Sequence, residues 1–589
     1  MWHYQAPLRD MRFVLQRVLQ ADQSWSRCLA FAELDLDTAD AVLAEAGRFA
    51  SEILQPLNGP ADLQGCTLAA DGSVRTPDGY RAAYQAFVEG GWPALPCDPA
   101  WGGQGLPLLV DAAMREMLSA SNHGWTMYPD LLHGAYETIK AHADDALKAR
   151  YLPKIASGEW LAAMALTEPQ AGSDLGLLRT RAEPQPDGSL RVSGSKIFIS
   201  GGEHDLTDNI VHLVLCRLPD APPGTKGISL ALVPKLLPDG TRNAMVCDGI
   251  EKKMGIKGSA TCAMRYEAAT GWLIGAPHRG LAAMFLMMNS ARLHVGLQGL
   301  GHQEMATQNA LRYAYERLQM RAARRPEGAA PAAADPIAWH PAMRHTLLRL
   351  QALTEAHRVI AYRAAQCIDE AHHQADDARR QRAAALAALL TPLVKASLTR
   401  QGFEAASAAL QVFGGYGYTH DYGIEQTVRD ARIAMVYEGT NEIQAIDLLT
   451  RKVLADGGSA LGLLLDDLQA EAARCEAEPA LADFGAALRA QCGRAREATA
   501  AVQAAVATDA EAPLRVADAY LLGLTHLLQA WAFAASARAA REDSDAAWAA
   551  AKTERMRYGL QWLLPESAAP WQQVCLAAQR TLPMLTLPG

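Results

Sequence analysis

The stretch VYEGTNEIQ, residues 436–444, places Glu438 between a tyrosine and a glycine, next to the expected start of a helix. A carboxylate in this position can have either of two roles. It can lie in the first helical turn, where unpaired backbone N–H groups attract negative charge. It can also act as a general base, if the fold holds it against a substrate proton. The motif alone leaves both roles open, and the first is the more common.

A second motif, MALTEPQAGSD at residues 164–174, supplies groups suited to a flat polar ligand. Thr167, Gly172 and Ser173 offer two hydroxyl groups and a bare backbone within one short loop. Such groups bind a ring edge or a phosphate without adding charge. A turn capped by serine and aspartate explains the same residues equally well.

A third motif, SGSKIFISGG at residues 193–202, has the alternation of a strand. Strict alternation predicts Phe198 and Ser200 on one face, with Ile197 and Ile199 on the other. An aromatic side chain on the first face could cover a flat cofactor. Taken alone, the segment is more typical of a core strand that ends in a glycine turn.

The fourth motif, LQVFGGYGY, lies upstream of Glu438. Gly414, Gly415 and Gly417 follow Gln411 within a few residues. Glycines allow a backbone to approach a pyrophosphate, or to be pressed between helices. A glycine cluster is weak evidence by itself, but its order ahead of Glu438 in one turn–helix unit is specific.

The elements that must position these motifs follow from the hydrophobic period. Residues 37–158 and 280–456 have apolar residues at helical spacing, whereas residues 162–277 alternate in short runs bounded by turns. The runs in 280–456 are long enough for an antiparallel bundle, and an alanine-rich helical stretch follows residue 456. We therefore predict a mainly α protein with an inserted, mostly antiparallel β-domain.

Composition narrows the class of protein. The chain has 589 residues and a formal net charge of −9, so it has no general attraction to nucleic acid or anionic lipid. Its ten cysteines are scattered without metal-ligand spacing, which suits a reducing compartment and predicts no metal site. We see no signal peptide and expect a cytoplasmic protein. Residues 519–537 are long and apolar enough to span a bilayer, but polar interruptions favour a buried bundle helix, with peripheral membrane contact as the alternative.

The four motifs, together with the helix–β–helix order, resemble those of the acyl-CoA dehydrogenases over residues 37–454. The start of the chain, the stretch EKKMGIKGSATC and the helical tail are similar to a branch of larger members. That branch includes broad-range fatty acyl-CoA dehydrogenases and 3-(methylthio)propanoyl-CoA dehydrogenase.

The resemblance implies the acyl-CoA dehydrogenase fold: an N-terminal helical domain, a barrel-like middle β-domain and a C-terminal helical bundle, here with an extra helical domain. The expected segments are an extension at 1–36, helices at 37–160, the β-domain at 161–279, the bundle at 280–456 and the added helices at 457–589.

The resemblance also implies noncovalently bound FAD. Residues 411–415 match the loop that reaches the FAD of a neighbouring subunit, and we expect a homodimer. The residues that match FAD contacts of the family are Met164, Leu166, Thr167, Gly172, Ser173, Phe198, Ile199, Ser200, Arg292, Arg317, Gln411, Phe413, Gly414, Gly415, Thr440, Asn441 and Glu442.

The implied reaction is the oxidation of an acyl-CoA thioester to its trans-2-enoyl form. Glu438 matches the base that takes the α-proton, while flavin N5 takes the β-hydride. Some family members carry the base just before the arginine matched by Arg292, where this chain has Ala291. In the family, the backbone N–H of the base and a ribityl hydroxyl stabilise the enolate oxygen. Ser173, Asn289 and Gly439 are the expected substrate contacts.

Electron-transfer flavoprotein is the expected electron acceptor. An acyl-CoA oxidase would share every motif, so that alternative stays open. A DNA-binding flavoprotein on the same fold is disfavoured by the net acidic tail, and an inactive scaffold by the retained Glu438 and flavin loops. Acyl chain length is open: Tyr128, Met284, Met287 and Met288 can line the acyl pocket or pack in the core.

Overall fold

The computed structural model describes residues 3–586, which form two compact units. The first comprises residues up to 47, residues 108–116 and residues from 295 onward; the second comprises residues 48–107 and 117–294. Helices α6 (Leu108–Thr126) and α9 (Gly280–Glu316) each continue from one unit into the other. The five-segment division stays a prediction, and its outermost residues, 1–2 and 587–589, lie outside the described part of the chain.

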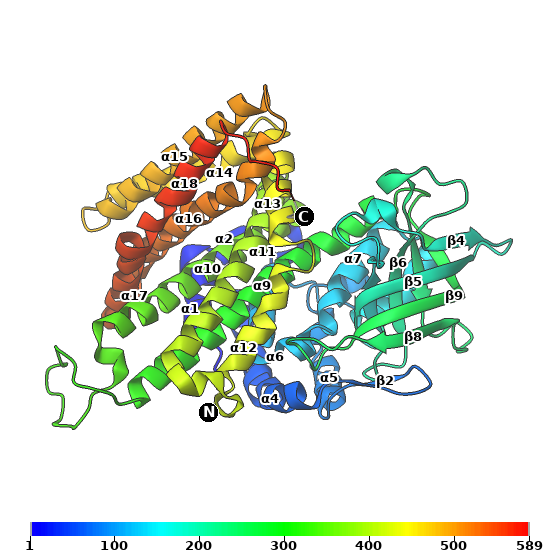
Figure 1. Ribbon diagram of the computed structural model, residues 1–589, viewed down its shortest axis with the longest axis horizontal. Helices are drawn as coiled ribbons and strands as arrows, with labels where there is room; N and C mark the ends of the chain where they lie inside the picture. The colour runs from blue at the N-terminus through cyan, green and yellow to red at the C-terminus, as the bar shows by residue number, and fades with distance from the viewer. Residues whose placement is uncertain (1–2, 587–589) are drawn as a thin grey trace. The chain divides into compact units, whose positions relative to one another are not determined.

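The second unit contains a seven-stranded sheet, drawn in cyan to green in Figure 1. Its order is β3-β6-β7-β9-β5-β4, with β8 also paired to β9. Only the β3–β6 pair is parallel, so the prediction of a mostly antiparallel β-domain is confirmed. The strands are β3 (Leu161–Ala165), β4 (Arg181–Pro184), β5 (Leu190–Ser200), β6 (Ile210–Cys216), β7 (Ser229–Pro234), β8 (Met245–Ile250) and β9 (Thr261–Ile274).

Helices complete the second unit. Asp144 is the N-cap of α8, since its carboxylate accepts a hydrogen bond from the Leu147 N–H at 2.8 Å. A short hairpin, β1 (Thr67–Leu68) with β2 (Val74–Arg75), follows α4 and precedes α5 in the chain. The sequence analysis did not predict it. The helices are α4 (Gln55–Gln64), α5 (Tyr80–Glu89), α7 (Leu132–His142) and α8 (Asp145–Ala156).

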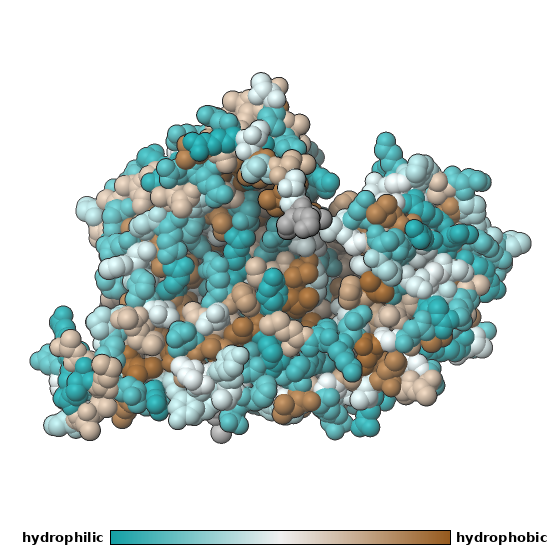
Figure 2. Space-filling view, in the orientation of Figure 1, coloured by the Kyte–Doolittle hydropathy of each residue, from teal (hydrophilic) through white to brown (hydrophobic). Residues whose placement is uncertain are grey.

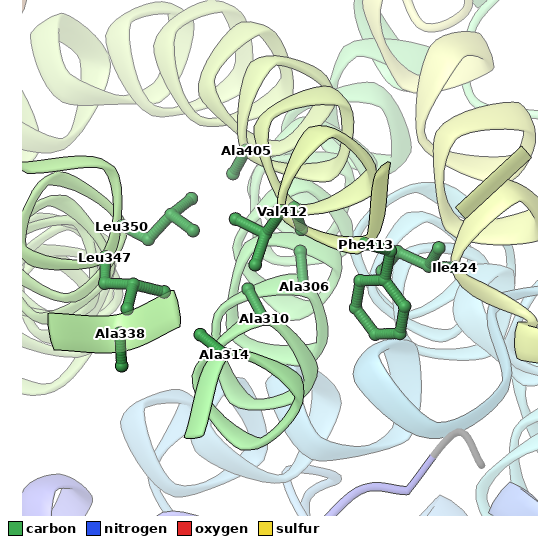
Figure 3. Close-up of a cluster of buried hydrophobic side chains, with 11 residues drawn as sticks. Ala306, Ala310, Ala314, Ala338, Leu347, Leu350, Ala405, Val412, Phe413 and Ile424 are labelled. Carbon is green, nitrogen blue, oxygen red and sulfur yellow. The ribbon is translucent and has the colours of Figure 1, made fainter. Parts of the chain in front are cut away.

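The first unit is built on the long helices that the sequence period predicts. They are α9, α10 (Pro341–His373) and α11 (Asp377–Phe413), followed by the short α12 (Ile424–Ala431) and α13 (Asn441–Ile446). Asp376 caps α11 through the Arg379 N–H at 2.8 Å, and the helix ends at Gly414, whose φ is 62°. Figure 3 shows a cluster of apolar side chains from these helices, in which Phe413 and Ile424 lie beside the alanines of α9. Small residues on α9 let the neighbouring helix come close.

A close approach in this unit joins the backbones of α9 and α11. A methyl group on Gly402 of α11 would overlap the carbonyl oxygen of Gly299 on α9, and one on Gly299 would overlap the Leu398 carbonyl oxygen. A methyl group on Gly296 would lie 2.6 Å from the Val394 side chain. Any side chain at these glycines must push the two helices apart.

The C-terminal helices enclose α16 (Ala512–Ala540), which packs against α10, α13, α15, α17 and α18. Most of its residues are buried, so the prediction that 519–537 is a buried bundle helix is confirmed. On the face in Figure 2, hydrophilic residues over this part of the molecule are mixed with scattered hydrophobic ones. The neighbouring helices are α14 (Ser459–Glu476), α15 (Ala482–Val506), α17 (Ala546–Tyr558) and α18 (Ala568–Ala577).

A different helical stretch has the length and composition of a membrane span. Among the described residues, 377–418 alone meets this criterion, and 72% of its most apolar window is buried inside the protein. This stretch includes α11, the central helix of the bundle, and such burial is typical of a core helix.

A buried charge network connects both ends of the chain to the bundle. The Arg358 guanidinium on α10 pairs with Glu116 at 2.6 Å, with Glu304 at 2.5 Å and with Asp10 near the N-terminus. Asp10 also pairs with Lys552 of α17. The positive charges hold the pKa of Asp10 down to about 2, although burial opposes that shift. The N-terminal helix α1 (Leu8–Phe13) and the added C-terminal helices are therefore part of one packed unit.

We predict that Gly402→Ala lowers the free energy of unfolding by about 1–3 kcal/mol, because the new methyl group forces α9 and α11 apart. Gly493→Ala in α15 is the matched control, since a methyl group there meets no atom within 4 Å. That control is expected to be neutral or to stabilise by about 0.5–1 kcal/mol. Denaturant unfolding measures both variants, and equal stabilities would contradict the close contact.

Candidate active site

Glu438 lies in a turn between a 3₁₀ segment (Arg432–Met435) and α13, not in the first turn of the helix. Its side chain is half-buried. The backbone is left-handed at two successive residues, with φ 57° at Glu438 and 83° at Gly439. A non-glycine residue in this region is strained, so the surrounding contacts must hold it there.

Two side chains hold the carbonyl groups of this turn. The Gln444 side-chain amide donates to the Glu438 carbonyl at 2.9 Å. The Lys395 ammonium of α11 donates to the Gly439 carbonyl at 2.7 Å and to the Asn441 side-chain oxygen at 3.0 Å. The preceding residue is fixed as well, because the Tyr437 hydroxyl donates to Gln298 of α9. Gly439 has no room for a side chain, since a methyl group would lie 2.7 Å from the Gln444 nitrogen.

Thr440 and Glu442 fill the role that the sequence first suggests for Glu438. The Thr440 hydroxyl is the N-cap of α13 and accepts a hydrogen bond from the Ile443 N–H at 3.4 Å. Glu442 lies in the first turn, where its own N–H and the Thr440 hydroxyl lower the pKa of its carboxyl. These two residues therefore satisfy the helix start, and Glu438 lies outside the first turn.

A cavity of about 520 Å³ in the first unit brings the predicted FAD contact Arg317 together with three that are distant from it in sequence, Phe413, Gly414 and Gly415. Gln411 is not among its lining residues; it lies exposed on the last turn of α11.

The walls of this cavity suit a ligand that carries both rings and phosphates. The Arg317 guanidinium lies over the Tyr416 ring at 5.3 Å, and Tyr313 stacks on Phe413 at 4.1 Å. A methyl group on Gly414 or Gly415 would meet nothing within 4 Å, so their backbone faces open space. An arginine beside bare glycine backbone fits a pyrophosphate, and the residues present fit FAD.

In the second unit, a buried ion pair joins the two strand-side motifs. Lys196 on β5 donates to Glu168 at 2.9 Å and to the Leu166 carbonyl at 2.8 Å. The Ile197 N–H donates to the Thr167 carbonyl at 2.9 Å. Burial raises the pKa of Glu168, but Lys196 and the hydrogen bonds from residues 179 and 180 outweigh it and hold the pKa at about 2. Met164, Leu166 and Thr167 lie half-buried here, while Gly172 and Ser173 are exposed.

The strand carrying Phe198 is irregular, although Phe198 and Ile199 differ in burial as the predicted facing expects. The β5–β9 register shifts between Lys196 and Ile199, and Phe198 has φ 58°. Lys196 and Ile199 are both buried although they are three residues apart, so strict alternation fails. Phe198 is 58% exposed, and Ser200 is half-buried. The bulge turns an aromatic ring out of the sheet, as covering a flat ligand requires.

On α9, the predicted phosphate contact Arg292 lies beside the predicted substrate contact Asn289. Arg292 is buried and donates to the exposed Asn289 at 3.3 Å. Ala291, at the alternative base position, is buried and carries no acid.

The candidate acyl-pocket residues lie mainly in the core. Tyr128 is buried, with its hydroxyl bonded to the Gly258 carbonyl at 3.1 Å and to the Ala260 N–H at 2.8 Å. Met284 and Met287 are fully buried, and Met287 packs beside Gly134 of α7. Met288 is half-buried.

Four residues that make these contacts escaped the sequence analysis: Lys395, Gln444, Glu168 and Lys196. Lys395 carried a signal, because it stands alone in the apolar run LTPLVKASL of a helix predicted to lie in the bundle. A lysine there must find buried acceptors. Lys196 and Glu168 each lie inside a recognised motif, but nothing local shows that they pair.

Comparison with known proteins agrees with this geometry. Sequence profiles of the acyl-CoA dehydrogenase N-terminal, middle and C-terminal domains match residues 37–159, 163–269 and 278–453. The chain belongs to the acyl-CoA dehydrogenase family, whose members are FAD-dependent oxidoreductases that act on CoA thioesters.

Three relatives show how far the similarity extends. The 3-methylmercaptopropionyl-CoA dehydrogenase of Ruegeria pomeroyi is 40% identical over 97% of this chain and 98% of its own. The broad-specificity linear acyl-CoA dehydrogenase FadE5 of Mycobacterium tuberculosis is 35% identical over 80% and 78%. The crystal structure of an acyl-CoA dehydrogenase complexed with FAD from Bacillus anthracis superposes with a TM-score of 0.75 at 20% identity, covering 94% and 91%.

We predict that Glu168→Gln destabilises the protein by about 3–5 kcal/mol, because the buried Lys196 ammonium loses its counter-charge. A carboxyl with a lowered pKa stabilises the fold above its unfolded value near 4.5 and loses that contribution as the pH falls towards 2. The variant should therefore show a weaker decline in stability over this range than the wild type. Denaturant unfolding at several pH values measures the difference.

The double variant Glu168→Gln, Lys196→Met is the control. It removes both charges and should recover much of the lost stability. A single variant as stable as the wild type at neutral pH would contradict the ion pair.

Proposed function

We propose that this protein oxidises an acyl-CoA thioester to trans-2-enoyl-CoA and that Glu438 removes the α-proton. The observation that carries this proposal is the strained left-handed turn at Glu438 and Gly439, which Gln444 and Lys395 hold from two sides. Strain of this kind is retained where a side chain must be presented in one orientation. The absence of an acid at Ala291 supports the same assignment.

The proposed reaction has one main chemical requirement. The α-proton of a thioester is weakly acidic, so a carboxylate can take it only if the developing enolate oxygen is stabilised. We propose that the Glu438 N–H donates to this oxygen while its carboxylate accepts the proton. Gly439, next to the base, is the proposed contact for the thioester. FAD, when bound, supplies the two-electron acceptor for the hydride that leaves the β-carbon.

The proposed FAD contacts divide into two groups. In the second unit, residues 164–173 and the strand at 198–200 would hold the ring system, with the exposed Phe198 against it. In the first unit, Arg317 and the glycines at 414 and 415 would hold phosphates. We propose that Arg292 holds a further phosphate, of FAD or CoA, and that Thr440, Asn441 and Glu442 complete the FAD contacts.

We propose a cytoplasmic homodimer in which the Arg317 cavity takes part in a site shared between subunits. Exposed apolar side chains near this cavity support an interface there: Tyr418 is 85% exposed, and Met320 is 77% exposed. Light scattering on the FAD-loaded protein measures the oligomeric state.

Glu438→Gln should bind FAD and acyl-CoA normally but reduce its flavin at least about 10²–10⁴-fold more slowly, the usual contribution of a positioned base. Anaerobic stopped-flow measurement of flavin bleaching gives the rate. Glu497→Gln, an exposed acid on α15, is the matched control and should react like the wild type. A Glu438→Gln rate close to wild type would falsify the assignment.

For the substrate, we propose 3-(methylthio)propanoyl-CoA, supported by the near full-length similarity to the Ruegeria enzyme. Broad activity on linear acyl-CoAs is the alternative. Assays across a chain-length series with electron-transfer flavoprotein as acceptor should give the highest kcat/KM for the methylthio thioester. A flat profile would support the alternative, and reoxidation by oxygen as fast as by the flavoprotein would indicate an oxidase.

A further inference from the structure

Lys395 is a fully buried lysine in the middle of α11, with 0% of its side chain exposed. Its ammonium reaches the turn that contains Glu438, 43 residues further along the chain, and donates to the Gly439 carbonyl at 2.7 Å. It also donates to the Asn441 side-chain oxygen at 3.0 Å, and the Thr399 hydroxyl, one turn along α11, lies 3.2 Å from the same oxygen. An ammonium is costly to bury unless polar groups surround it, so its location beside this turn requires an explanation.

The turn itself needs external support. Left-handed backbone at a residue with a side chain costs about 1–3 kcal/mol, and here it occurs at Glu438 directly before a left-handed glycine. The Lys395 and Gln444 side chains bind the two carbonyl groups of this turn. Because a trans peptide is planar, binding the Glu438 and Gly439 carbonyls fixes the two peptide planes that follow the Glu438 Cα and so restricts rotation of the backbone at Glu438.

The support comes from a rigid element. Lys395 lies one turn before Leu398, whose carbonyl is in contact with Gly299 of α9. On α9, the Gln298 side-chain oxygen accepts a hydrogen bond from the Tyr437 hydroxyl. The turn is therefore held from both α9 and α11, the two helices that meet at Gly299 and Gly402. Charge-assisted hydrogen bonds from a buried ammonium are about twice as strong as neutral ones.

We propose that Lys395 is a positioning residue for proton abstraction: it holds the Gly439 carbonyl so that the left-handed turn presents the Glu438 side chain and N–H to the thioester. This inference rests on the proposed role of Glu438 as the base. Lys395 acts through the backbone of the turn and does not itself exchange a proton with the substrate. Its loss should slow α-proton removal without weakening acyl-CoA binding.

The test compares FAD-loaded Lys395→Met and Gln444→Met with the wild type. Anaerobic flavin reduction is measured against acyl-CoA concentration, which separates the limiting rate from the apparent Kd. Acetoacetyl-CoA is titrated in parallel, because its acidic α-proton can be lost without any oxidation, and the absorbance of the bound enolate reports that step alone. Lys552→Met is the control for removal of an equally buried ammonium from the same unit.

We expect the limiting rate of Lys395→Met to fall about 10–100-fold, since a displacement near 1 Å of a reacting group costs about 10²-fold. The apparent Kd should change less than about threefold on the same reasoning, while the fraction of bound acetoacetyl-CoA enolate falls. Gln444→Met should show the same pattern more weakly, because it removes a neutral donor. Lys552→Met should keep the wild-type rate.

Flavin reduction by Lys395→Met within twofold of wild type would overturn the proposal. An equal loss of rate in Lys552→Met would also overturn it, since the effect would then be general destabilisation. If Lys395→Met yields no folded holoenzyme, Gln444→Met decides, and a wild-type rate there rejects the proposal. The Glu438→Gln variant separates the two inferences. If it reduces its flavin at the wild-type rate, both the base role of Glu438 and the positioning role of Lys395 are overturned. If Glu438→Gln is slow but Lys395→Met keeps the wild-type rate, only the positioning role of Lys395 is overturned.

Discussion

The backbone contact between Gly299 of α9 and Gly402 of α11 is the constraint on which the arrangement of the first unit depends. Helices usually keep their axes about 8–10 Å apart because side chains separate them. Here each helix presents a glycine where the other has a carbonyl group. The pair is thereby locked in one register, and the polar residues that it carries, Gln298 and Lys395, are placed where both reach the turn around Glu438.

Unusual backbone conformations occur in both motifs that we assign to the flavin and the substrate. Glu438 has φ 57° in the first unit, and Phe198 has φ 58° in the second. A buried lysine lies close to each: Lys395 binds the Gly439 carbonyl of the Glu438 turn, and Lys196 lies at the register shift before Phe198. Lys395 binds within the left-handed turn and so helps to hold a conformation that local propensity disfavours, whereas Lys196 joins its strand to the loop at Leu166 and Glu168.

Buried charge has a second use away from these motifs. The Arg358 network ties Asp10 near the start of the chain and Lys552 near its end to the bundle helices. Such networks stabilise little relative to apolar packing, but removal of one member leaves an unpaired buried charge. The added C-terminal helices are therefore coupled to the core of the bundle, in agreement with the enclosed position of α16.

The sequence by itself determined the main elements and the family, and it singled out Glu438 as the candidate base. Helical period was sufficient for α9, α10 and α11, since each amphipathic pattern is a property of neighbouring residues. The motif VYEGTNEIQ and its relation to the glycine cluster identified Glu438 as a candidate base. Only the tertiary structure decided how the turn that carries Glu438 is held. Lys395 and Gly439 are 44 residues apart, and their contact depends on the register between packed helices. The left-handed backbone at Phe198 likewise belongs to the pairing of β5 with β9, because a register shift interrupts the alternation that a sequence pattern assumes.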